Sequence, residues 1–146
     1  MIATLAQPRS SGGPPGRLQK GVAVSVTLQR AIPILRIFDE SKAREFYLDY
    51  CGFAVEFEHR FHENAPLFMG ISRGGVQIFL SEHHGDGSPG TYVRIDMRGL
   101  DELHTELRAK LYRYMNAGIQ EQEWGRRELT VYDPFGNRLE FLEPKS

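Results

Sequence analysis

The stretch WGRRELTVYDPFGNRLEF, residues 124–141, decides how the C-terminal part of this chain folds. At its centre, Asp133-Pro134-Phe135-Gly136-Asn137 contains the residue types that favour tight turns. Apolar and polar residues alternate on both sides of the turn, at 127–132 and 138–143, as expected of half-buried strands. The stretch therefore predicts an antiparallel hairpin.

The sequence before this hairpin predicts a strand, a helix and a further strand. Leucines recur at helical spacing from Leu100 to Leu111, with acidic residues in the first turn and basic residues in the last. Segments 92–97 and 120–124 are strand-like. With the hairpin, residues 91–143 thus form a predicted β-α-β-β-β module.

The same order of elements is predicted in residues 31–83. A strand at 32–37 precedes a helix whose apolar positions include Ala43, Phe46, Tyr47 and Tyr50 and which ends at Gly52. Strands follow at 53–60, 67–73 and 76–82, and Gly74-Gly75 joins the last two as a tight turn. The glycine-rich loop 83–90 then connects two modules of the same order.

Composition limits the classes of protein that this chain can belong to. The 146 residues suit one domain, and no apolar run approaches the roughly 20 residues of a membrane span. The segment 1–30 contains four basic and no acidic residues and is rich in Ser, Gly and Pro, which predicts a disordered extension before a domain at 31–146. That domain has a net charge of about −5, which argues against nucleic acid as a partner. The single cysteine, Cys51, predicts a cytoplasmic protein and a buried thiol.

Two sets of residues resemble motifs of the vicinal oxygen chelate superfamily, also called the glyoxalase, bleomycin-resistance and dioxygenase fold. The first set is Ile37-Phe38-Asp39 followed by Ala43-Arg44-Glu45-Phe46-Tyr47 and Gly52-Phe53; the second is Trp124-Gly125, Arg127-Glu128 and the turn and strand from Asp133 to Phe141. The resemblance implies an α+β fold in which two βαβββ modules form a curved mixed sheet around a cavity, in one chain or across a homodimer.

Many enzymes of this superfamily hold a divalent metal in the cavity. The resemblance places the usual ligand positions at Ile32, near Phe79, at Tyr92 and at Glu140, and only Glu140 is of a ligand type. One carboxylate does not make a site for a divalent ion, so no metal or other cofactor is expected. If a metal binds, the candidate ligands are Glu140, Glu82 and His84; the alternative is that Glu82 and the neighbouring histidines anchor the loop after the strand.

Strand alternation predicts which side chains lie on the face of the sheet opposite the helices. Eight candidate ligand-binding residues lie on this face, and Trp124 is added as a ninth. The nine are Arg36, Phe38, Phe79, Tyr92, Arg94, Trp124, Glu128, Tyr132 and Glu140. Aromatic rings with carboxylates suit a flat, partly cationic molecule. The alternative is that the Arg and carboxylate side chains pair with one another and that Trp124 fills a dimer interface.

The first functional hypothesis is a metal-independent binding protein that resembles bleomycin-resistance proteins. It would give antibiotic resistance by sequestering a cationic aromatic drug, or another small-molecule ligand, in a homodimer cavity, and no catalytic residue is assigned. The second is a metal-dependent lyase, isomerase or dioxygenase. The third is a regulatory or structural dimer with a self-paired cavity smaller than about 300 Å³.

Overall fold

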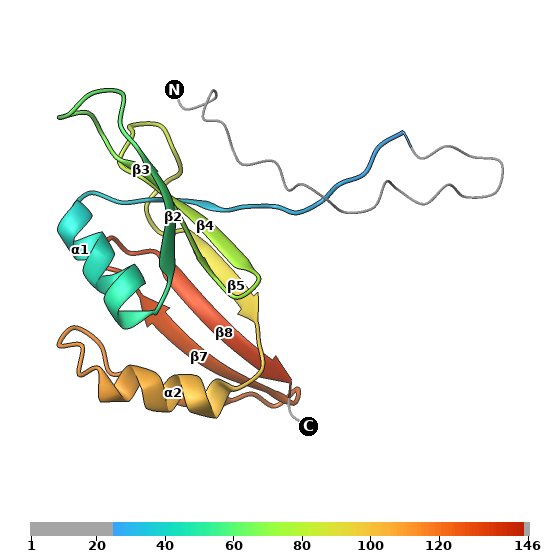
Figure 1. Cartoon of the computed structure of the whole chain (residues 1–146). Coiled ribbons are helices and arrows are strands. Elements are labelled where there is room, and N and C mark those ends of the chain that lie inside the picture. The colour runs from blue at the N-terminus through green and yellow to red at the C-terminus, as the bar shows by residue number, and fades with distance from the viewer. Residues whose placement is uncertain (1–24, 145–146) are drawn as a thin grey trace. The chain divides into compact units, whose positions relative to one another are not determined.

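The computed structural model of the chain describes residues 25–144 (Figure 1). The chain divides into two units, of which the second begins at Ile32. In the first unit, the described residues 25–31 are exposed and have no regular secondary structure. The rest of the predicted extension, residues 1–24, lies outside the described part of the chain.

The first module begins with a short strand and a two-part helix. Strand β1 (Ile34–Arg36) leads to helix α1 (Glu40–Arg44), which continues as the π-helix η1 (Glu45–Tyr50). The helix starts at Asp39 because the Asp39 carboxylate accepts a hydrogen bond from the Lys42 amide at 2.9 Å. It stops before Gly52, whose φ of 78° is the left-handed conformation that glycine adopts at helix ends.

Three strands complete this module, and the second module repeats the order. Strands β2 (Ala54–His59), β3 (Phe68–Arg73) and β4 (Val76–Ser81) follow η1. The second module consists of β5 (Tyr92–Asp96), α2 (Leu100–Ala109), β6 (Ile119–Glu121), β7 (Arg126–Tyr132) and β8 (Arg138–Pro144).

The two modules have the same sheet topology. The first sheet has the strand order β1-β4-β3-β2 and the second β5-β8-β7-β6. In each sheet the first strand pairs in parallel with the last, and the other pairings are antiparallel. The predicted α+β fold with two βαβββ modules is therefore confirmed, but the strands form two separate four-stranded sheets and not one continuous sheet.

One apolar core lies between the sheets and the helices. Helix α2 packs on β6, β7 and β8 (Figure 1), and its Leu100, Leu103 and Leu107 are buried. In the first module, the buried face of α1 and η1 includes Phe46 and Tyr47, both 0% exposed. Burial of these apolar side chains is the main contribution to the stability of the fold.

Polar contacts also connect the two modules. The Tyr47 hydroxyl donates to Asp133 Oδ2 at 2.6 Å, and Asn137 Nδ2 donates to the Arg36 carbonyl at 2.9 Å. Arg73, at the end of β3, forms two hydrogen bonds with Glu106 of α2, at 2.9 and 2.8 Å. The modules of the second unit thus share both a core and buried hydrogen bonds.

Several helices and strands have boundaries that differ from those predicted from the sequence. Strand β1 has three residues where 32–37 was predicted, and the first helix contains a π-helix that apolar spacing does not reveal. Strand β6 ends at Glu121, so Trp124 lies in the turn before β7 and not in a strand. Within residues 25–144, no helix has the length and apolar character needed to cross a bilayer.

Candidate functional site

Predicted site residues on the second sheet form a network of contacts. Arg94 pairs with Glu140 across β5 and β8, with Arg94 Nε 3.5 Å from Glu140 Oε1. The Tyr92 hydroxyl donates a hydrogen bond to Glu140 Oε2, which raises the pKa of Tyr92. The Arg138 guanidinium lies 3.5 Å from the centre of the Tyr92 ring. The Arg94–Glu140 contact is the pairing of an arginine with a carboxylate that the sequence predicts as the alternative to ligand binding.

This network leaves aromatic surface exposed while it covers the central carboxylate. Glu140 is 6% exposed, whereas Tyr92 is 42% and Tyr132 50% exposed. Glu128 accepts a hydrogen bond from Gln122 at 3.1 Å, and Trp124 is 67% exposed in the turn between β6 and β7. A ligand on this face would meet the rings first and would reach Glu140 only by displacing a neighbour.

On the first sheet, the predicted site residues have different surroundings. The Arg36 guanidinium lies 4.8 Å from the centre of the Phe38 ring, which is 56% exposed. Phe79 is only 3% exposed because the rings of Phe57 and Phe68 pack against it, each with its centroid at 5.3 Å. Phe79 thus supports an aromatic layer and does not present its own ring.

The structure brings some of the predicted residues together but does not join the two groups through any recorded contact among residues 25–144. Tyr92, Arg94 and Glu140 are in contact, as are Arg36 and Phe38. Three prominent cavities of the described chain have volumes of about 470, 310 and 680 Å³ and are lined by other residues. The first lies beside the Gly74-Gly75 turn and α2.

The metal that is common in the vicinal oxygen chelate superfamily has no suitable ligand set in the described part of this chain. Among residues 25–144, no three His, Cys, Asp or Glu side chains are placed to hold one ion. Glu140 is engaged by Tyr92 and Arg94, and Glu82 accepts a hydrogen bond from the Leu67 amide at 2.9 Å. The alternative ligand set of Glu140, Glu82 and His84 is therefore not assembled within one chain.

The single cysteine has the environment that the sequence predicted. Cys51 is 1% exposed, and burial raises the pKa of its thiol well above the ordinary value. Only the thiolate is strongly nucleophilic, so Cys51 has the properties of a small apolar core residue.

A group of residues near the end of the first sheet was not predicted as part of the site. The Phe61 ring contacts the imidazoles of His59 and His83, with centroid distances of 4.8 and 5.8 Å. His83 is only 8% exposed. Alternation along β2 places Phe57 and His59 on one face, but periodicity does not predict the position of the loop that carries Phe61.

The fold consists of two βαβββ modules of identical topology, with helices on one side of each sheet. This is the architecture of proteins built from paired βαβββ modules. The family model described as "Glyoxalase superfamily protein" matches residues 19–146. The chain therefore belongs to the glyoxalase superfamily, as its sequence motifs indicated.

Individual proteins that are similar to this chain include bleomycin-resistance and bleomycin-binding proteins. A bleomycin resistance protein of Geobacillus stearothermophilus is 28% identical over 132 residues, covering 78% of this chain and 96% of that protein. The structure of a bleomycin-binding protein from Streptomyces verticillus in complex with copper(II)-bleomycin has 27% identity and a TM-score of 0.60, covering 80% of this chain and 96% of that one. The bleomycin resistance determinant of transposon Tn5 has the same fold, with a TM-score of 0.63, 20% identity, and coverage of 82% and 100%.

Proposed function

We propose that this protein confers antibiotic resistance by binding a cationic aromatic drug of the bleomycin type and sequestering it without chemical change. The observation that carries the proposal is the exposed aromatic surface around a buried carboxylate on the second sheet, formed by Tyr92, Tyr132 and Glu140. Aromatic rings bind flat heterocycles by stacking, and a carboxylate attracts a cationic group. The similarity to bleomycin-resistance proteins supports the choice of drug.

The proposed binding unit is a homodimer. Each sheet of the described chain has two strands with an unpaired edge, β1 and β2 in the first sheet and β5 and β6 in the second. A second copy would cover the exposed rings and convert two open faces into a closed site. We further propose that binding needs no metal, because the described residues of one chain assemble no set of ligands, and that the protein acts in the cytoplasm, where a free thiol such as Cys51 stays reduced.

Calorimetric titration with metal-free bleomycin, in the presence of EDTA, tests this function. We expect saturable binding to a dimer, and we expect Glu140→Gln to weaken binding about tenfold because a charged partner is lost. The matched control is Glu102→Gln, since Glu102 is an exposed carboxylate on α2. Binding of the drug by the wild type together with unchanged affinity in Glu140→Gln would refute the role of Glu140.

In the calorimetric titration, absence of drug binding would refute sequestration of bleomycin. Elemental analysis of the purified protein then distinguishes a metal-independent binding protein from a metal-dependent enzyme. A stoichiometric divalent metal would overturn metal independence and would favour a metal-dependent lyase, isomerase or dioxygenase. Light scattering during size-exclusion chromatography measures the oligomeric state, and a monomer that binds the drug would overturn the dimer.

A further inference from the structure

Three buried nitrogen atoms near one end of the first sheet have no hydrogen-bond partner within residues 25–144. They are Arg36 Nε, His59 Nε2 and His83 Nε2. The whole His83 residue is only 8% exposed. Native proteins rarely leave buried polar groups unpaired, because such groups have lost their hydrogen bonds to water.

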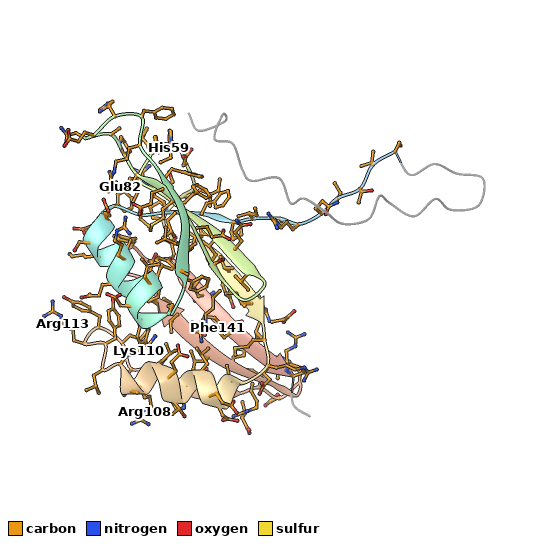
Figure 2. The ribbon with its side chains drawn as sticks, in the orientation of Figure 1. His59, Glu82, Arg108, Lys110, Arg113 and Phe141 are labelled. Atoms are coloured by element: carbon orange, nitrogen blue, oxygen red, sulfur yellow. The ribbon has the colours of Figure 1, made fainter. Side chains whose placement is uncertain are left out.

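These residues form one continuous group of contacts, which we call the first-sheet cluster: Arg36, His59, Phe61 and His83. Arg36 Nη1 donates a hydrogen bond to the His83 carbonyl, and the Phe61 ring contacts both imidazoles. His59 and Glu82 lie toward the same end of the first sheet (Figure 2). The cluster therefore has contributions from β1, from β2 and from the segments that follow β2 and β4.

Carboxylates close to this cluster have other partners. Asp86 Oδ2 accepts a hydrogen bond from the Ser81 hydroxyl at 2.8 Å, and Glu82 Oε1 accepts one from the Leu67 amide at 2.9 Å. Both contacts hold the loop after β4 in place, which is the anchoring role that the sequence suggested for this segment. Arg36 Nε thus keeps an N–H without a partner in the described chain, in a guanidinium whose Nη1 is bound to the His83 carbonyl.

The chemistry of the unpaired atoms indicates what would bind. The Arg36 Nε–H can only donate, and a histidine nitrogen donates when it carries a proton. A carboxylate accepts several hydrogen bonds and complements the charge of a guanidinium. Phe61 is 55% exposed and offers a ring face next to these donors. The first-sheet cluster therefore combines hydrogen-bond donors with an exposed aromatic ring.

We propose that the first-sheet cluster is a subsite for the carboxylate of an aromatic ligand. The proposal rests on the proposed function, because it assumes that the same faces of the sheets bind a small molecule. It extends the proposed ligands from cationic aromatic molecules to those that carry a carboxylate. The second sheet, with Glu140, favours a cationic group, while the first sheet favours an anionic one. The preferred ligands then include aromatic acids and aromatic zwitterions as well as cationic drugs.

Nuclear magnetic resonance titration of the full chain at fixed pH, with 2-naphthoate and with 2-naphthamide, tests the subsite. The two probes share a ring system and differ in charge. We expect the acid to bind about tenfold more tightly than the amide, and we expect the acid to shift the imidazole nitrogen resonances of His59 and His83. Equal affinity for the two probes, or unshifted imidazole resonances with the acid, would overturn the subsite.

Two variants remove the proposed interaction, and a third serves as control. Arg36→Met and His83→Phe should each abolish the preference for the acid, whereas Arg98→Met should retain it because Arg98 is an exposed arginine beside α2. Thermal unfolding identifies a variant that does not fold, in which case the other variant decides. A retained preference for the acid in a folded variant would contradict the proposal.

A parallel titration with bleomycin separates failure of the subsite from failure of the proposed function. If bleomycin binds and 2-naphthoate does not, the subsite is wrong and the proposed function stands. If 2-naphthoate binds as expected and bleomycin does not, the subsite stands and the proposed drug is wrong. If neither binds, both proposals are refuted.

Discussion

Replacement of Tyr47 by Phe removes a single hydroxyl from the contact between the two modules. Tyr47 is 0% exposed, and its hydroxyl donates to Asp133 Oδ2 at 2.6 Å. The same oxygen also accepts from Asn137 Nδ2 at 2.8 Å, so Asp133 Oδ2 keeps one partner in the variant, and the bonds that Oδ1 accepts from the Phe135 and Asn137 amides are unaffected. A hydrogen bond to a charged group contributes about 1.5–3 kcal/mol, and we expect Tyr47→Phe to lower the free energy of unfolding by about 2 kcal/mol. The corresponding fall in Tm is about 8 °C.

Urea denaturation followed by circular dichroism measures this change, and its dependence on pH provides a second test. Burial, with the negative charge of Asp133, raises the pKa of Tyr47 well above its ordinary value. The unfolded chain ionises this tyrosine near pH 10, so the hydroxyl contributes fully below that pH and its contribution falls as pH rises above it. The difference in the free energy of unfolding between wild type and Tyr47→Phe should therefore become smaller above about pH 10.

The control is Tyr114→Phe, because Tyr114 is 59% exposed. This variant should change the free energy of unfolding by less than about 0.5 kcal/mol. Equal stability of Tyr47→Phe and wild type at neutral pH would refute the energetic role of the contact. A difference that grows above pH 10 would refute the assigned direction of the pKa.

Three further changes test other contacts. Gly70→Ala should lower the free energy of unfolding in urea by about 1–3 kcal/mol, because an added Cβ would lie 2.2 Å from Phe57 Cε1; unchanged stability would contradict this packing. Arg73→Met should lower it by less than about 1 kcal/mol at neutral pH, because the pair with Glu106 is partly exposed. Arg73 lowers the pKa of Glu106, so this contribution should disappear as pH falls through that lowered pKa, and a loss that persists in acid would contradict the assignment. Asn137→Ala should lower the free energy of unfolding by about 3 kcal/mol, measured as a lower midpoint of thermal unfolding, because a side chain that is 0% exposed loses three hydrogen bonds. A smaller loss of stability than that of Tyr47→Phe would contradict this ranking.

Local patterns predicted the order of elements because each pattern depends on neighbours in sequence. The turn from Asp133 to Asn137 forms as expected, since Asp133 Oδ1 accepts hydrogen bonds from the amides of Phe135 and Asn137. The alternation at 127–132 and 138–143 corresponds to strands β7 and β8, in which the apolar residues Leu129, Val131, Leu139 and Phe141 are buried.

The surroundings of the candidate site residues depend on contacts between distant segments, which periodicity does not contain. Alternation placed Phe79 on the face opposite the helices, but it could not show that Phe57 and Phe68 would cover the ring. It also could not show that the Glu140 carboxylate would be covered by Tyr92. The roles of the nine predicted ligand-binding residues remain predictions that binding experiments must test.

The contacts from Tyr47 to Asp133 and from Asn137 to Arg36 have a consequence for the order of folding. Their partners are 86 and 101 positions apart in sequence. During synthesis on a ribosome, the first module emerges well before the residues that complete its buried hydrogen bonds. Closure of the core must therefore wait until the turn before β8 has left the exit tunnel, and contacts between such distant residues favour slow folding. Until then the nascent first module exposes apolar surface that chaperones recognise.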